Sequence, residues 1–138
     1  MITPEVSTNS QAAKDLEGGS SKRVLYVDDL RELREVATLA LSRCGHTVDT
    51  ACDGAEGLAK VTANPGLYDI VISDHHMTGM NGIELVMGLR ALKYPGTIAI
   101  VSSELNQDVE EEYRSLGVDR ILYKPVALHD LRDLVLES

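Results

Sequence analysis

A short apolar stretch that ends at a carboxylate constrains this chain more than any other feature. Residues 70–72 form a continuous apolar run, and Asp74 follows at the start of a loop with two glycines. A run this short is typical of a strand buried on both faces, as in a parallel sheet. Asp74 would then lie at the carboxyl end of a central strand, where open α/β sheets bind ligands. Because Asp is also common in turns and helix caps, this stretch alone leaves its role open.

Apolar runs alternate with segments of helical periodicity along the rest of the chain. We predict strands at residues 24–27, 46–50, 69–73, 97–102 and 121–123. We predict helices over about residues 33–44, 55–61, 82–94, 106–116 and 128–135. Strands connected by helices pair in parallel with right-handed crossovers, so helices cover both faces of the sheet. The predicted fold class is therefore α/β, a doubly wound five-stranded parallel sheet.

The strand order follows from which strands suit the edges. The second predicted strand is polar and the fifth is short, so both fit edge positions. The flavodoxin-like order 2-1-3-4-5 places them there. Residues 1–21 are polar and aperiodic and end in Gly-Gly-Ser-Ser, so we predict a disordered tail or linker before a single domain at 22–138. Since Phe and Trp are absent, we expect an aliphatic core.

Composition excludes several function classes. The formal net charge of −9 argues against nucleic-acid binding through this domain, because phosphate neutralisation needs an excess of Lys and Arg. No apolar run approaches the ~20 residues of a membrane span, and the N-terminus lacks the pattern of a signal peptide. A cytoplasmic location and no membrane partner follow by default. Cys44 and Cys52 lack metal-ligand spacing and are predicted to be two ordinary thiols.

Chemically active side chains follow four of the five predicted strands. The first strand ends at Asp28 and Asp29, the third at Asp74, the fourth at Ser102 and the fifth at Lys124. In a parallel sheet these ends point the same way, so the side chains converge on one crevice. Three nearby carboxylates repel each other, and a cation relieves the repulsion. A small set of oxygen ligands suits Mg²⁺, and a carboxylate beside it can accept a phosphoryl group as an acyl phosphate.

This set resembles the response-regulator receiver domain of two-component signalling. The matching segments are 24–29, 69–74 with Met77, Gly79, Met80 and Gly82 after it, 100–103 and 123–125, so the resemblance covers about residues 22–137. Four motifs in the right order at strand ends are a specific signal. The resemblance implies a phosphorelay module that is not an enzyme, apart from catalysing its own phosphorylation and dephosphorylation. Its partner would be a sensor histidine kinase or a histidine phosphotransfer protein.

The resemblance also assigns roles residue by residue. Asp74 would be the phosphoacceptor. Asp28 and Asp29 would hold Mg²⁺, with Asp74 and the main-chain carbonyl of His76 as further ligands. Lys124 would pair with the phosphoryl group. In addition, Ser102 would be the switch hydroxyl that moves to bond the phosphoryl group, and a cis bond is expected before Pro125.

Three departures from the family pattern matter. Thr78 stands where the family usually has proline, so the loop after Asp74 is expected to be less rigid. His75 and His76 are unusual beside a phosphoacceptor, and we interpret them as two independent imidazoles pointing opposite ways rather than a metal pair. Ile121 replaces the usual Tyr or Phe of the switch. Tyr123 lies on the same face of the strand, and either supplies the missing aromatic contact to a partner or packs on a neighbouring helix.

Three other functions are alternatives for a chain with this pattern. A phosphoaspartyl phosphatase of the haloacid-dehalogenase type also uses an Asp after a central parallel strand with Mg²⁺. It needs a second Asp two residues later, where this chain has His76. A flavodoxin-like cofactor binder would place a phosphate beside Asp28 and Asp29, which would repel it. An interaction module that is never phosphorylated would not need all of the charged groups of the crevice.

Overall fold

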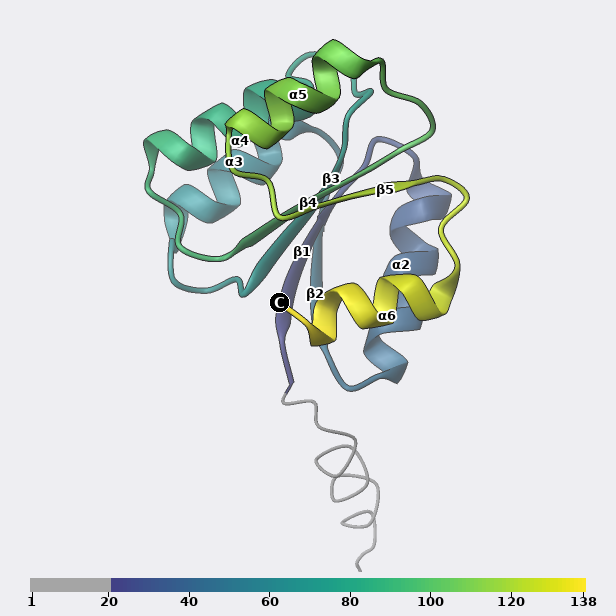
Figure 1. Ribbon diagram of the computed structural model, residues 1–138. Helices are drawn as coiled ribbons and strands as arrows, with labels where there is room; N and C mark the ends of the chain where they lie inside the picture. The colour runs from purple at the N-terminus through teal and green to yellow at the C-terminus, as the bar shows by residue number, and fades with distance from the viewer. Residues whose placement is uncertain (1–20) are drawn as a thin grey trace, which may run out of the picture.

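A five-stranded parallel sheet forms the centre of the protein, in a computed structural model that describes residues 21–138. The strands are β1 (Arg23–Val27), β2 (Thr47–Ala51), β3 (Ile70–Asp74), β4 (Thr97–Ser102) and β5 (Arg120–Tyr123). Their order is β2-β1-β3-β4-β5, and every neighbouring pair is parallel. This confirms the predicted fold class and strand order (Figure 1).

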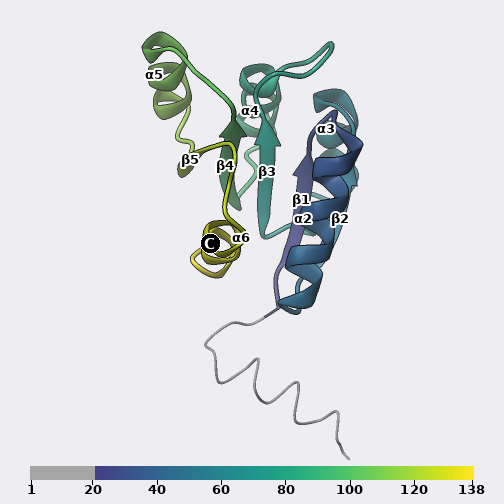
Figure 2. The ribbon, with the colours of Figure 1, turned by 90° about the vertical axis from the view of Figure 1, so that its right-hand side faces the viewer.

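Five helices connect the strands and cover both faces of the sheet. They are α2 (Arg31–Arg43), α3 (Gly54–Ala63), α4 (Gly82–Ala91), α5 (Gln107–Ser115) and α6 (Leu128–Leu136). Helices α2 and α6 pack on one face and α3, α4 and α5 on the other (Figures 1 and 2). Polar caps start the helices of the second face. The Asn81 side chain accepts from Glu84 N–H and Glu84 accepts from Asn81 N–H, a reciprocal capping box that opens α4.

Two apolar clusters form the core, one on each face of the sheet. Val71 belongs to the cluster beneath α3, α4 and α5, whereas Ile70 and Ile72 belong to the cluster beneath α2 and α6. All three side chains are fully buried. The continuous apolar run of the third strand is therefore explained, because a strand covered on both faces has no side exposed to water.

Several expectations about the core and the element boundaries are wrong. The core is not purely aliphatic, since four of the five tyrosines are buried: Tyr26, Tyr68, Tyr94 and Tyr113. Three of their hydroxyls have hydrogen-bond partners: Tyr68 donates to Asp49 Oδ2 at 2.8 Å, Tyr94 donates to the Tyr68 carbonyl oxygen at 2.9 Å, and Tyr113 pairs with His75 Nδ1. The second strand begins at Thr47 instead of residue 46, and the third extends through Asp74.

The helical stripes are narrower than their periodicity predicts. Val36 and Leu128 occupy apolar positions at helical spacing in the sequence, yet they are 51% and 57% exposed. Ala37 and Leu41 are the buried residues of α2, whereas Val36 and Leu128 line an apolar pocket between α2 and α6. Helix periodicity identifies the apolar face of a helix, but it does not say how much of that face a neighbouring element covers.

The carboxyl ends of the strands lie at one edge of the sheet. In Figure 2 the arrowheads of β1, β3 and β4 point the same way, and the loop after β3 projects beyond them. The predicted tail at residues 1–21 lies outside the described residues except for Ser21, so that division of the chain stays a prediction. Within residues 21–138, no helix is both long and apolar enough to cross a bilayer.

A substitution at Gly82 tests how tightly the strand edge is packed. A Cβ at position 82 would lie 2.9 Å from the carbonyl oxygen of Asp74 and 3.0 Å from Cα of His75, so the backbone must shift. We expect Gly82→Ala to lower the free energy of unfolding by about 1–3 kcal/mol, as overpacking does. Gly66→Ala is the matched control, because nothing lies within 4 Å of that Cβ. Urea denaturation measures both; equal effects would contradict the packing described here.

Candidate functional site

Three carboxylates meet at the carboxyl edge of the sheet. Asp28 and Asp29 directly follow β1, and Asp74 is the last residue of β3. One oxygen from each lies within 4.8 Å of the others. Asp28 and Asp74 are 1% and 6% exposed, whereas Asp29 is exposed. The strands therefore bring together the three acidic residues that the sequence predicts, two of them out of water.

An ammonium group lies between the two buried carboxylates. Nζ of Lys124, the residue after β5, is 3.1 Å from Oδ2 of Asp28 and 3.4 Å from Oδ2 of Asp74. The backbone N–H of Lys124 donates to the carbonyl oxygen of Ser102 at 2.8 Å, which continues the pairing of β4 with β5. The peptide bond from Lys124 to Pro125 is cis, as the resemblance implies. The predicted lysine is thus in contact with both carboxylates.

The charge of Asp74 is incompletely compensated. Burial raises the pKa of the Asp74 carboxyl above its ordinary value, and the nearby Asp28 charge adds to the rise. The Lys124 ammonium and the hydrogen bond from His75 N–H to Asp74 Oδ1, at 2.8 Å, act in the opposite direction but do not cancel it. Asp28 is held separately, because its Oδ1 accepts from Leu30 N–H at 2.9 Å. The site therefore favours the arrival of positive charge.

Ser102 supplies a hydroxyl with unused bonding capacity. It is the last residue of β4 and is fully buried. Its Oγ has no hydrogen-bond partner among residues 21–138. A buried hydroxyl without a partner is energetically unfavourable, and a ligand with acceptor oxygens would satisfy it. Ser102 thus fits the predicted role of a group that bonds something entering the crevice.

The two histidines after Asp74 have separate partners. Nδ1 of His75 shares a hydrogen bond of 2.5 Å with the Tyr113 hydroxyl, and Nε2 of His76 lies 3.2 Å from the carbonyl oxygen of Glu104. Their rings nevertheless meet edge to face, with centroids 4.8 Å apart. The expectation that they point opposite ways is wrong because the strand ends at Asp74, so the alternation of an extended segment no longer applies.

Burial of His75 favours its neutral form. Desolvation lowers the pKa of the His75 imidazole, and His76 adds to this, against a smaller opposite effect of Asp74 and Glu112. Burial likewise raises the pKa of the Tyr113 phenol, with the charges of Asp74 and Glu112 contributing. The pair is therefore a contact between two neutral groups beside a carboxylate.

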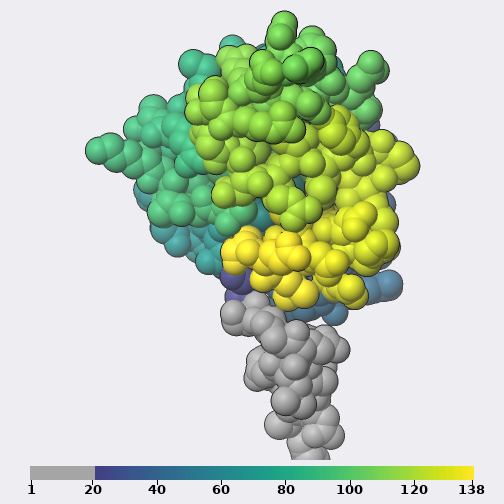
Figure 3. All heavy atoms as spheres, in the orientation of Figure 1, coloured from purple at the N-terminus to yellow at the C-terminus, as the bar shows by residue number. Residues whose placement is uncertain are grey.

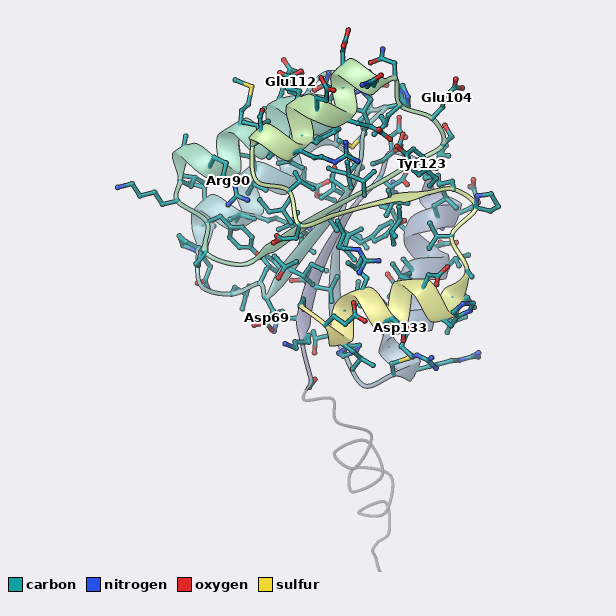
Figure 4. The ribbon with its side chains drawn as sticks, in the orientation of Figure 1. Asp69, Arg90, Glu104, Glu112, Tyr123 and Asp133 are labelled. Carbon is teal, nitrogen blue, oxygen red and sulfur yellow. The ribbon has the colours of Figure 1, made fainter. Side chains whose placement is uncertain are left out.

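Tyr113 is a neighbour of this site, in contact with His75, that the sequence did not indicate. It lies 38 positions after His75, on α5, where helical periodicity predicts only a core residue. The role of the His76 carbonyl as a metal ligand stays a prediction. The switch positions differ in burial: Ile121 is partly buried against the cluster beneath α3, α4 and α5, whereas Tyr123 is 43% exposed. Figure 4 shows Tyr123 at the end of β5, with Glu104 in the loop after β4.

Comparisons with known proteins identify the family of this chain. Residues 24–136 match the family model of the response regulator receiver domain. The chain is 32% identical over 114 residues to the transcriptional regulatory protein PrrA of Mycobacterium tuberculosis, covering 83% of this chain and 48% of that protein. It is also 32% identical over 117 residues to the sensor histidine kinase AruS of Pseudomonas aeruginosa, covering 82% of this chain and 12% of that protein. The chain thus spans at most about half of these relatives.

Solved structures show the same fold. Chemotaxis protein CheY4 of Vibrio cholerae superposes with a TM-score of 0.77 at 29% identity, covering 86% of this chain and 98% of that one. A CheY-like receiver domain of Methanospirillum hungatei gives a TM-score of 0.80 at 26% identity, covering 86% and 93%. The chain belongs to the response-regulator receiver domains. It is a receiver module of two-component signal transduction, and nothing found supports the haloacid-dehalogenase alternative.

The stability of the metal-free protein tests the electrostatics of Asp74. Since its pKa is higher in the folded than in the unfolded protein, the ionised carboxylate destabilises the folded state above that raised pKa. In the presence of EDTA, Asp74→Asn should therefore raise the melting temperature by a few degrees at neutral pH. The advantage should shrink as the pH falls through the raised pKa and disappear below the ordinary Asp pKa of about 3.9, where the carboxyl is protonated in both the folded and the unfolded wild type.

The matched control for this measurement is Asp133→Asn. Asp133 lies on α6 with its side chain half-exposed, where a lost charge should change the free energy of unfolding by less than about 0.5 kcal/mol. Thermal unfolding of the three proteins from about pH 3 to pH 8 gives the comparison. An Asp74→Asn protein that is less stable than wild type at neutral pH would refute the proposed imbalance.

Proposed function

We propose that this domain accepts a phosphoryl group on Asp74 from a histidine of a two-component partner. The observation that carries the proposal is the Lys124 ammonium seated between buried Asp28 and Asp74, beside the unpartnered Ser102 hydroxyl. A phosphoryl group needs a nucleophile, cationic groups and donors for its oxygens, and this crevice offers each of them. The donor would be a sensor histidine kinase or a histidine phosphotransfer protein.

The transfer is a displacement at phosphorus. The Asp74 carboxylate forms the new P–O bond as the P–N bond to the donor histidine breaks. The electron pair of the P–N bond stays on the imidazole nitrogen, which takes a proton from water. Lys124 would shift from its two carboxylate partners toward a phosphoryl oxygen, and Ser102 would donate to another. The domain thus contributes positioning and charge rather than a turnover activity, consistent with a signalling role.

The three carboxylates fit a bound Mg²⁺. One oxygen from each lies within 4.8 Å of the others, and carboxylate oxygens are hard ligands. The group carries three formal negative charges, and Lys124 supplies one positive charge against them. We propose that Asp28, Asp29 and Asp74 hold the ion, together with the His76 carbonyl. When bound, Mg²⁺ would neutralise carboxylate and phosphoryl charge.

The output surface lies beside the site. Residues of α5, β5 and α6 form one continuous face of the molecule (Figure 3). Tyr123 lies on it, 43% exposed, so we favour its role as an aromatic contact for a protein partner over simple packing on a helix. We infer a cytoplasmic setting and no nucleic-acid contact through this domain, in line with its formal charge of −9.

Phosphorylation assays with Asp74→Asn test the proposal directly. Acetyl phosphate or a phosphorylated histidine donor should add one acid-labile phosphate to the wild type, and only with Mg²⁺ present. Asp74→Asn keeps the shape of the side chain but removes the nucleophile, so incorporation should fall by at least about 100-fold, the scale for loss of a reacting group. Asp133→Asn should retain the wild-type rate. Phosphate incorporation is measured by intact mass spectrometry. If Asp74→Asn took up phosphate at the wild-type rate, another residue would be the acceptor.

Asp29→Asn tests the metal separately from the nucleophile. Asp29 is the exposed member of the carboxylate group, so its replacement removes a ligand charge with little change in packing. Affinity for Mg²⁺, measured by titration calorimetry, should fall by roughly 10-fold or more, and the stabilisation of the folded state by Mg²⁺ should fall with it. In EDTA the variant should be slightly more stable than wild type. Equal Mg²⁺ affinity in the two proteins would remove Asp29 from the metal site.

A further inference from the structure

A hydrogen bond joins the residue after Asp74 to the interior of helix α5. The backbone N–H of His75 donates to Asp74 Oδ1 at 2.8 Å, and the imidazole of the same residue shares its 2.5 Å hydrogen bond with the Tyr113 hydroxyl. The two rings are also in edge-to-face contact, at a centroid distance of 5.5 Å. One residue therefore contacts the acceptor carboxylate with its backbone and α5 with its side chain.

The hydrogen bond between His75 and Tyr113 is tightly packed by its surroundings. Gly82 N–H donates to the carbonyl oxygen of His75 at 3.0 Å, and a Cβ on Gly82 would collide with the Tyr113 hydroxyl. The first residue of α4 therefore packs directly against the hydrogen bond between His75 and Tyr113. A close-packed interior has little free volume. When one residue of such a contact is displaced, its neighbours must therefore move as well.

Helix α5 is attached mainly through Tyr113, with Val109 packing beside it as a partly buried contact. Tyr113 is its only fully buried side chain, and most of its other residues are polar or charged. The loop that leads into α5 has a second tie, from His76 Nε2 to the Glu104 carbonyl. An element with so few buried apolar contacts is easily displaced, so its position follows that of its anchors.

We propose that the hydrogen bond between His75 and Tyr113 carries the state of Asp74 to helix α5, in place of an aromatic side chain on β5. The proposal rests on Asp74 being the phosphoacceptor. A phosphoryl group on Asp74 brings new acceptor oxygens beside His75 N–H, which turns from the carboxylate toward them. The imidazole moves with its backbone, and Tyr113 moves α5. Ile121 cannot serve this purpose, because it has no polar tip and a stiff χ1.

The assignment gives the two tyrosines different tasks. Tyr113 is fully buried and receives the displacement, whereas Tyr123 is exposed on the adjoining surface and meets the partner. The glutamates of α5 would move with Tyr113. Figure 4 shows one of them, Glu112, on the outer side of that helix.

Hydrogen exchange of the α5 amides, with and without beryllofluoride and Mg²⁺, tests the link. In the full-length wild type the phosphoryl mimic should change these exchange rates by about fivefold, the effect of one net hydrogen bond. Tyr113→Phe keeps the ring but removes the hydroxyl and should lose most of that response. It should still be phosphorylated by acetyl phosphate at the wild-type rate, because Tyr113 does not touch the reacting atoms. His75→Leu removes the same bond from the other side and should lose the same response.

Tyr94→Phe is the matched control. Tyr94 is also buried and also donates one hydrogen bond from its hydroxyl, to the Tyr68 carbonyl at the opposite end of the sheet. It should lose comparable stability yet keep the full response of α5. The proposal is overturned if Tyr113→Phe keeps the response, if Tyr94→Phe loses it equally, or if α5 of a phosphorylated wild type does not change. A wild type that takes up neither phosphate nor beryllofluoride would overturn the proposed function as well.

Discussion

The ammonium of Lys124 between Asp28 and Asp74 is the contact on which the rest of the site depends. Removing two carboxylates from water costs several kcal/mol each unless they are paired. Lys124 approaches both within 3.4 Å, but it supplies one positive charge against three negative ones. Burial, with the Asp28 charge adding to it, raises the pKa of Asp74 despite the Lys124 ammonium. A crevice built in this way is stable enough to fold and still favours a cation and a phosphoryl group that rebalance its charge.

Parallel topology makes this contact possible. Lys124 and Asp28 are 96 positions apart, and they meet because the strands that precede them end at the same edge of the sheet. The order β2-β1-β3-β4-β5 places β1, β3 and β4 side by side, so Asp28, Asp74 and Ser102 face one space. The two apolar clusters on either side hold the strands in register. Stability and function are thus separated: the core lies along the strands and the chemistry at their ends.

The sequence predicts those parts of the site that depend on local pattern and on sheet topology. Asp28, Asp74, Ser102 and Lys124 follow apolar runs, and any parallel sheet would gather them. It does not predict contacts that depend on how far a helix reaches or how a loop turns. Val36 and Leu128 are exposed because they line an apolar pocket between α2 and α6 that neither helix fills. The approach of the His75 and His76 rings depends on the strand ending at Asp74, and the boundary of an element is poorly marked in sequence.

The tyrosines show why a missing residue in a motif does not mean a missing function. Loss of the aromatic at position 121 suggests, from sequence alone, that coupling between the phosphoacceptor and the output face is weakened. The structure offers another route, because a phenol from α5 reaches His75 beside Asp74. That contact requires Gly82, whose lack of a side chain leaves room for the hydroxyl. The proposed coupling therefore depends on three residues that fit together sterically: His75 after β3, Gly82 at the start of α4, and Tyr113 on α5. A sequence motif along one strand cannot describe a contact among three separate elements.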